Sequence, residues 1–357
     1  MITRRIRTIC AALTVVAPLA ITPLGARAAD SGAFPLAIAQ QPQRWALEWY
    51  IATKEGWWKD VGIDPTMTTF TAGPPEIAAG ASGSWEVGGA GDLPSMLGAA
   101  KYGLTTIAIA DSEAAIITLM ATKDKADAYL HNPSLIKGKT IPETSNSTGE
   151  WGAAACLEKK FGLKPSEYHF VNLSPPEINA AVSSGRYDLA QVWSPNVYIL
   201  ESAIGAKVIC NAAQVGVPIT SNIFATQAFA TAHPEIVAKF LAVYLRAIAW
   251  EREHPQEAVA DLGEFFNSVG VKIPPAYLAQ ELHARPAYTL DEQLKIFGAN
   301  TAGTPEIVDW WNQLGTFMQS VSIVSETPPA SQFATDKYLQ MIAADPKLRA
   351  FANDDTP

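Results

Sequence analysis

The chain has 357 residues, of which 48% are hydrophobic and 17% charged, so its composition is that of a globular protein and not of a disordered one. The length exceeds one ordinary core and predicts two domains of roughly 150 residues each. A formal net charge of −9 without a run of basic residues argues against nucleic acid as a partner. Three cysteines exclude a disulfide-rich scaffold, and no Cys/His spacing predicts a metal site.

The N-terminal segment has the pattern of a secretory signal peptide. Three arginines within the first seven residues precede an uncharged stretch over residues 8–26, and Ala26-Arg27-Ala28 places small residues at the cleavage positions. The alternative of a membrane anchor is less favoured, because Pro18 and Pro23 interrupt the stretch. We therefore expect residues 1–28 to be a signal peptide, removed when the protein is exported to the periplasm.

Strand and helix patterns alternate over the first two thirds of the chain. Strands are predicted at 36–39, 67–70, 86–91, 104–110, 138–141, 168–173, 187–193 and 206–210. Helices are predicted after most of these strands, beginning near Trp45, Gly73, Asp92, Glu150, Ser174 and Ser194. Such alternation indicates parallel or mixed sheets covered by helices. Later segments are mainly helical, with helices predicted at 234–253, 256–268, 275–284, 290–299, 304–319 and 334–345.

Ligands of open α/β sheets bind beyond the carboxyl ends of the strands, against helix N-termini. Six loops at such ends carry small and polar residues: Gln40–Arg44, Ala72–Pro75, Ala90–Leu93, Ser145–Gly149, Ser174–Pro176 and Ser194–Asn196. The sharpest signal is Ser145–Gly149, because three hydroxyls and an amide precede a helix whose N-terminus favours an anion. The alternative there is plain N-capping by Ser147 or Thr148, without a ligand.

Two side-chain types in these loops suggest what the ligand looks like. Arg44 follows the first strand and is suited to pair with a carboxylate or sulfonate, the alternative being a solvated loop charge. Trp45, Trp85 and Trp193 lie near strand ends and favour an apolar or aromatic ligand body, although Trp45 and Trp85 are as well explained by packing between helix and sheet. The predicted ligand-binding residues are Gln41, Gln43, Arg44, Trp45, Gly73, Pro74, Ala90, Gly91, Asp92, Ser112, Ser145, Ser147, Thr148, Gly149, Ser174, Trp193, Ser194, Asn196 and Ser221.

An ordered set of motifs resembles the solute-binding proteins of ABC importers for nitrate, sulfonates, taurine and bicarbonate. The resemblance covers residues 34–300 and rests on Gly73-Pro-Pro-Glu-Ile77, Ala81–Asp92, Leu135-Ile-Lys-Gly-Lys-Thr-Ile141, Ser174-Pro-Pro-Glu177 and Ser184–Pro195. Two positions depart from the family pattern: Ser84-Trp85 replaces an acidic and an aliphatic residue, and Gly89 stands where an aromatic residue is common.

The resemblance implies an α/β, two-lobed periplasmic-binding-protein fold of type II, in which each lobe is a mixed sheet flanked by helices. A hinge joins the lobes, with crossovers expected near 110–114 and 222–225. Lobe 1 would comprise residues 29–112 plus 225–357, and lobe 2 residues 113–224. The implied function is capture of a small organic anion and its delivery to an ABC import permease. The anion would be a sulfonate or carboxylate, with an aromatic body as one alternative. We expect a monomer with no cofactor and no metal.

Two rival functions were weighed. An enzyme on the same fold, similar to a thiamine-precursor synthase, is disfavoured because the cysteine-rich motif of those enzymes is absent and Glu48, Glu55 and Glu113 have no evident acid–base partner in the sequence. A ligand-sensing module is disfavoured because the chain ends at Pro357 without an anchor or signalling domain. The sequence leaves open whether Cys156 and Cys210 form a disulfide, and it favours two separately buried thiols.

Overall fold

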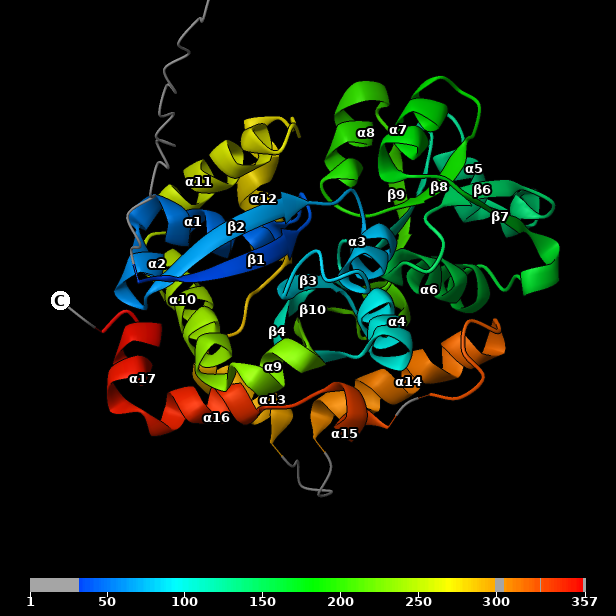
Figure 1. The fold of residues 1–357 in the computed structure, drawn as a ribbon. Coiled ribbons are helices and arrows are strands. Elements are labelled where there is room, and N and C mark those ends of the chain that lie inside the picture. The colour runs from blue at the N-terminus through cyan, green and yellow to red at the C-terminus, as the bar shows by residue number, and fades with distance from the viewer. Residues whose placement is uncertain (1–31, 299–304, 328, 356–357) are drawn as a thin grey trace, which may run out of the picture. The chain divides into compact units, whose positions relative to one another are not determined.

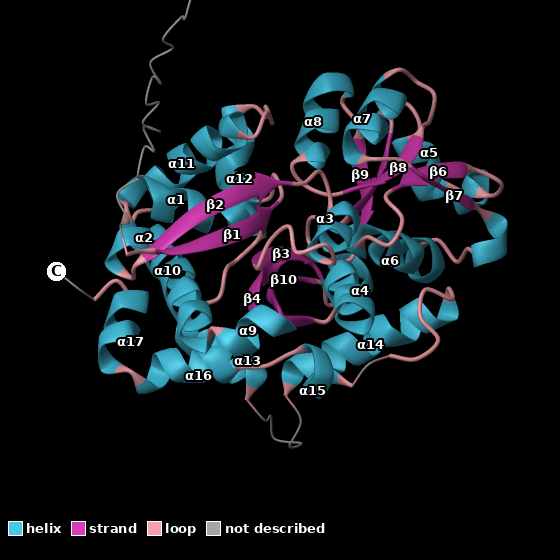
Figure 2. Cartoon of the chain, viewed as in Figure 1, coloured by secondary structure: helices cyan, strands magenta, loops and turns pink. Residues whose placement is uncertain are grey.

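The structure is a computed structural model, and it describes residues 32–298, 305–327 and 329–355. The expected signal peptide, residues 1–28, lies outside the described residues. Figure 1 traces the chain, and Figure 2 shows how its helices surround the strands. None of the helices in the described part is long and apolar enough to cross a membrane.

A five-stranded mixed sheet gathers strands from distant parts of the chain, in the order β2-β1-β3-β10-β4. Its members are β1 (Phe34–Gln40), β2 (Ile63–Thr69), β3 (Val87–Gly91), β4 (Leu104–Ser112) and β10 (Thr220–Thr226). Strand β1 runs parallel to β2 and β3, whereas β10 runs antiparallel to β3 and β4. The helices between these strands are α1 (Leu47–Glu55), α2 (Trp57–Asp60), α3 (Gly73–Gly80) and α4 (Asp92–Tyr102).

The middle of the chain forms a three-stranded antiparallel sheet, ordered β8-β5-β9, and a two-stranded parallel sheet of β6 and β7. These strands are β5 (Thr118–Ala121), β6 (Thr140–Glu143), β7 (His169–Asn172), β8 (Leu189–Val192) and β9 (Lys207–Asn211). The helices are α5 (Ala126–His131), α6 (Thr148–Ala155), α7 (Pro175–Ser183) and α8 (Asn196–Ile204), and a π-helical turn at Cys156–Lys160 continues α6. Because β6 lies beside β8, the two small sheets adjoin each other.

The C-terminal part is helical, as expected. Its helices are α9 (Gln227–Ala232), α10 (Pro234–Glu253), α11 (Pro255–Ser268), α12 (Leu278–Ala284), α13 (Leu290–Phe297), α14 (Glu306–Ser320), α15 (Ala330–Phe333), α16 (Lys337–Ala344) and α17 (Pro346–Ala352). Helix α10 packs against α1 through a buried aromatic cluster in which Trp49 contacts Phe240 and Tyr244. Helix α14 lies against α4, and its Phe317 stacks on Trp151 of α6. The C-terminal helices therefore contact elements that belong to both groups of strands.

The structure differs from the sequence prediction at two strands. Strand β5 was not predicted, because a fully buried run of four residues shows no alternation of apolar and polar side chains. The second crossover was expected near 222–225, but these residues lie within β10, hydrogen-bonded between β3 and β4. The chain passes between the two groups of strands over 113–117 and 212–219. The division into two lobes remains a prediction. The second connection between the lobes would lie at 212–219 and not near 222–225.

Cys156 and Cys210 form a disulfide, with their Cα atoms 6.0 Å apart. The bond joins the end of α6 to β9 within an apolar cluster that includes Leu157 and Ile209. The expectation of two separately buried thiols is therefore wrong. The sequence left the pairing open, because 54 positions separate the two cysteines and the sequence does not give the distance between their Cα atoms.

Breaking this disulfide is expected to destabilise the fold. Closing a loop of this length restricts the unfolded chain, so Cys156→Ser with Cys210→Ser should lower the free energy of unfolding by about 2–5 kcal/mol. Chemical denaturation of the wild type and of the double variant measures the difference. Labelling of thiols under denaturing conditions without reductant provides the check on pairing: modification of Cys156 and Cys210 in the wild type would contradict the bond.

Candidate ligand-binding site

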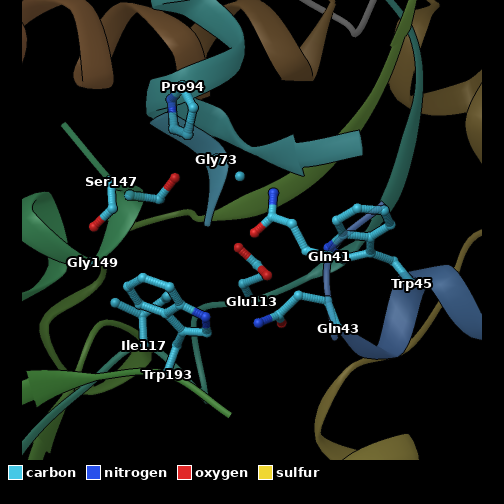
Figure 3. Close-up of a pocket in the computed structure, with 12 residues that line it drawn as sticks. Gln41, Gln43, Trp45, Gly73, Pro94, Glu113, Ile117, Ser147, Gly149 and Trp193 are labelled. Carbon is cyan, nitrogen blue, oxygen red and sulfur yellow. The ribbon is translucent and has the colours of Figure 1, made fainter. Parts of the chain in front are cut away.

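A partly open cavity lies between the edges of the two groups of strands, with about 330 Å³ of empty space that includes some open solvent. Figure 3 shows its lining side chains, which come from loops on both sides. The lining residues are Gln41, Gln43, Trp45, Gly73, Gly91, Pro94, Glu113, Ile117, Ser147, Thr148, Gly149 and Trp193. The cavity is small, so any molecule that it holds must be compact.

The cavity is closed on one side by contact between two helix N-termini. The hydroxyl of Thr148, the first residue of α6, accepts a hydrogen bond of 3.2 Å from the backbone amide of Leu93 in the first turn of α4. A Cβ atom placed on Gly91 would lie 2.3 Å from the Thr148 Oγ1 atom. Only glycine at position 91 leaves room for this approach, so the contact between α4 and α6 depends on it.

The N-terminus of α6 presents unpaired hydrogen-bond donors to the cavity. Ser147 is the N-cap residue, and its hydroxyl is buried without a hydrogen-bond partner. The first backbone amides of a helix also lack partners within it, and they carry the positive end of the helix dipole. An oxyanion is a good match to this group of donors. Ser147, Thr148 and Gly149 of the predicted Ser145–Gly149 loop therefore form a polar corner of the cavity.

Gln191 lies beside this corner with both of its amide atoms unpaired. It comes from β8, is fully buried, and forms no hydrogen bond through Oε1 or Nε2. A Cβ atom on Gly149 would lie 2.2 Å from the Gln191 Nε2 atom, so a glycine is required where α6 passes over this side chain. An unsatisfied buried amide is costly unless a further group completes it, so its presence beside the cavity points to a polar occupant.

A buried carboxylate, Glu113, faces the cavity from the chain segment that follows β4. Its Oε1 atom accepts a hydrogen bond of 2.6 Å from the Arg285 guanidinium. Burial raises the pKa of Glu113 to about 7, and the positive charge of Arg285 partly offsets that rise. Glu113 is thus a lining residue of the cavity whose carboxyl has a pKa near neutral pH.

Arg285 contacts two residues of the cavity lining, Gln43 and Glu113, from outside the cavity. The side chain is fully buried, lies within ion-pair distance of Asp111 and Glu281, and donates a 2.7 Å hydrogen bond to the Gln43 Oε1 atom. Glu281 in turn accepts a hydrogen bond of 2.6 Å from Ser194. One guanidinium thus orients two cavity-lining side chains, Gln43 and Glu113, and connects them to the loop after β8.

Nine of the predicted ligand-binding residues line the cavity together: Gln41, Gln43, Trp45, Gly73, Gly91, Ser147, Thr148, Gly149 and Trp193. Trp45 serves packing as well, because its ring lies in the space that a side chain at position 89 would take. This contact accounts for the glycine at position 89. Trp85 instead is buried against Phe224 and donates a hydrogen bond to the Glu76 carbonyl, in agreement with the packing alternative.

Arg44 does not reach the cavity. Its guanidinium is buried and forms ion pairs with Glu48, one helical turn further on, and with Glu251 of α10. The expected solvated loop charge is therefore wrong. The predicted pairing of Arg44 with a ligand is also without support, because both charged partners of its guanidinium are carboxylates outside the cavity lining.

The other predicted residues lie next to the cavity or in neighbouring grooves. Pro74, Ser145 and Ser174 line a separate polar groove, and Asn196 lines an outer groove that shares Gln43 and Trp193 with the cavity. The remaining side chains outside the lining are Ala90, Asp92, Ser112, Ser194 and Ser221. Asp92 accepts hydrogen bonds from Thr220 and Asn222 of β10, so it holds α4 on the sheet.

Sequence reasoning missed three lining residues, Pro94, Glu113 and Ile117. Pro94 packs against Gly73, where a Cβ atom would lie 2.6 Å from its ring. Glu113 and Ile117 lie on the first passage between the two groups of strands, which the sequence indicated as a crossover. Their place on this connecting segment could have predicted them, because ligands often bind at the interface between two domains, beside the segments that connect them.

Comparison with known proteins places the chain in a family. Residues 46–258 match the family model described as NMT1/THI5 like, so the chain belongs to that family. It is 31% identical over 190 residues to the taurine-binding periplasmic protein of Escherichia coli strain K12, covering 51% of this chain and 56% of that protein. It is 25% identical over 217 residues to a proposed aliphatic sulfonates-binding protein of Bacillus subtilis strain 168, covering 59% and 64%. The matches thus span less than two thirds of either relative.

Solved structures show the same fold. The alkanesulfonate-binding protein SsuA from Xanthomonas axonopodis pv. citri, solved bound to MOPS, superimposes with a TM-score of 0.69 at 18% sequence identity. The alignment covers 84% of this chain and 98% of that one. The chain therefore has the periplasmic-binding-protein fold, as the motifs predicted.

Substitution of Gly91 tests whether the contact between α4 and α6 is needed for binding. Gly91→Ala should lower the affinity for any solute of the cavity about tenfold or more, because the added methyl group prevents Thr148 from reaching α4. Thr148→Ala in the same chain removes the obstructing oxygen and should restore part of the affinity. Calorimetric titration measures both. Unchanged affinity in Gly91→Ala would show that closure at this point plays no part.

Stability should fall as pH rises through neutrality. Burial raises the pKa of Glu143 to about 8, above its value in the unfolded chain, so the folded state holds the extra proton between the two values. Between the pKa of Glu143 in the unfolded chain and its pKa of about 8 in the folded one, the free energy of unfolding falls by up to about 1.4 kcal/mol per pH unit. Glu143→Gln should flatten the decline and stabilise the protein at about pH 8. An identical pH profile in the variant would contradict the assignment.

Proposed function

We propose that this protein is an extracytoplasmic solute-binding protein that captures a small organic anion, a sulfonate or carboxylate, and delivers it to an ABC import permease. The observation that supports this most is the cavity at which the N-terminus of α6 and the unpaired Ser147 hydroxyl converge. The relatives named for taurine and sulfonates support the same class of solute. The site holds donors and a small volume, which favour binding of a compact acid.

The proposed mechanism is hinge closure between two lobes. Passages at 113–117 and 212–219 would act as the hinge, and the hydrogen bond between Thr148 and Leu93 would form when the lobes meet. Binding energy of the solute then shifts the population toward the closed form, which is the form a permease recognises. No bond of the solute is made or broken in this mechanism.

The proposal includes the location of the protein, its oligomeric state and its partner. The N-terminal pattern at residues 1–28 would direct the chain to the periplasm and be removed on export. The name of the relative from Escherichia coli, a periplasmic protein, supports this location. The mature protein is proposed to act as a monomer. Its macromolecular partner is the membrane permease.

An enzyme is the second candidate, since Glu113 is a buried carboxyl with a pKa near neutrality. Catalysis also needs a nucleophile or a proton-transfer partner within reach. The hydroxyls of Ser147 and Thr148 line the cavity, but no histidine, lysine or cysteine does. Within the described lining, the groups suit recognition better than turnover.

The function is tested by calorimetric titration of the purified mature protein with alkanesulfonates, carboxylates and nitrate. Wild type should bind at least one sulfonate or carboxylate, with a change in intrinsic tryptophan fluorescence that is absent in Trp193→Phe as a second readout. Ser147→Ala should weaken this binding about 10- to 150-fold, as expected for a hydrogen bond to a charged group, and should leave the melting temperature nearly unchanged.

Two results would contradict the proposal. The first is absence of binding across the whole panel, and the second is conversion of a bound solute into a new product during incubation. Ser202→Ala is the matched control for the serine substitution, because Ser202 lies exposed on α8 and outside the cavity lining. Its affinity should equal that of the wild type.

A further inference from the structure

A second and larger hollow, the α6–α14 groove, lies between helices α6 and α14 (Figure 1). It has about 1240 Å³ of empty space that includes open solvent, and it shares no lining residue with the cavity. One wall is a single face of α14, formed by Gln313, Thr316, Phe317 and Ser320. On the α6 side, the small side chains of Ala154–Ala155 leave the space between the helices open.

Two pairs of aromatic rings line the α6–α14 groove. Trp151 of α6 stacks on Phe317 of α14, with ring centroids 6.3 Å apart. Tyr168, just before β7, and Phe170 within it form the second pair, with centroids 5.1 Å apart. Val321 adds an apolar side chain that is 40% exposed. Aromatic faces attract both apolar rings and cations, so these walls suit a flat ligand that carries positive charge.

The groove also contains carboxylates without a basic partner. Glu150 and Glu158 both line it, and neither forms an ion pair with a basic side chain among the described residues. Glu150 accepts a hydrogen bond of 2.8 Å from the backbone amide of Asn146. Lys159 lies in the lining too, but its ammonium donates to the Val215 carbonyl at 3.3 Å. The described lining therefore has an excess of unpaired negative charge.

Tyr168 connects the acidic and the aromatic features of the groove. Its side chain is 7% exposed, and its hydroxyl has no hydrogen-bond partner among the described residues. Burial raises the pKa of Tyr168 to about 12, and the negative charges of Glu158 and Glu150 add to that rise, so both carboxylates lie near the phenol. A buried hydroxyl is costly when it stays unpaired. A protonated amine at this point would pair with the carboxylates and donate to the hydroxyl.

We propose that the α6–α14 groove is a second ligand-binding site and that its ligand is a small organic cation with an aromatic body. The ammonium group would lie beside Glu158 and the Tyr168 hydroxyl, and the aromatic body between the two pairs of rings. Val217 also lines the groove and lies on the passage at 212–219, so a bound cation would contact one of the two proposed hinge segments. The proposal does not depend on what the cavity binds.

Two probes of one size test the charge of the ligand. The compounds 2-phenylethylammonium and 2-phenylethanol share the ring and the chain length and differ in the charged group. Ligand-observed NMR titration of the purified mature protein should give about 3- to 30-fold higher affinity for the cation. Glu158→Gln should lower the affinity for the cation about two- to fivefold and leave that for the alcohol unchanged. Glu257→Gln, which neutralises an exposed carboxyl on α11 outside the groove, should bind both probes like the wild type.

A second set of variants tests the place of binding. Ala154→Phe puts a ring into the open part of the groove and should abolish binding of both probes. Ala181→Phe is the matched control, because Ala181 is half-buried on α7 and lies outside the groove. Thr316→Phe fills the groove from α14, where Thr316 is exposed, and should have the same effect as Ala154→Phe. If Ala154→Phe fails to fold, Thr316→Phe decides the question.

Four results would overturn the proposal. The cation may fail to bind, or the alcohol may bind equally well or more tightly. Binding of the cation that persists in both Ala154→Phe and Thr316→Phe would place it outside the groove. A dimer in sedimentation experiments that these variants dissociate would show that a second copy of the chain covers the groove. Each result leaves the solute-binding function untouched, because that function is tested with acids at the cavity.

Discussion

The buried guanidinium of Arg285 holds together the segments that meet beneath the cavity. It contacts Asp111 at the end of β4, Glu113 on the first passage between the strand groups, and Glu281 on α12. Burying a charge is costly unless it is paired, and loss of such a central partner typically costs about 3–5 kcal/mol. Since Arg285 lies in the C-terminal helical part, this ion cluster ties that part of the chain to the binding site.

The same interaction organises the site. By taking the Gln43 oxygen and one oxygen of Glu113, Arg285 leaves the other Glu113 oxygen and the Gln43 amide nitrogen for the cavity. Across the cavity, the contact between Thr148 and Leu93 brings two helix N-termini together. The cavity thus has hydrogen-bond acceptors on one side and a donor-rich corner on the other.

Local signals in the sequence were sufficient for the loops of the site but not for its electrostatics. The Ser147–Gly149 and Gly91 positions were predictable, because hydroxyls and glycines at a strand-to-helix turn are requirements of local backbone geometry. Arg44 was misread, although Glu48 four residues later was a visible partner, because its second partner Glu251 is 207 positions away.

Long-range pairing explains most of what the sequence did not show. Glu113 had no evident partner because Arg285 lies 172 positions along the chain. The disulfide and the place of β10 between β3 and β4 have the same origin, since both depend on segments brought together only in the folded chain. The alternation of strands and helices, by contrast, is set by local periodicity, and it led to the correct fold class.

The most direct test is a crystal structure of the mature protein grown with an alkanesulfonate that it binds. We predict difference density for the whole solute inside the cavity, with the sulfonate at Ser147 and the first turn of α6. Density with the sulfonate against Glu113, or a bound solute in one of the outer grooves with the cavity empty, would contradict this prediction.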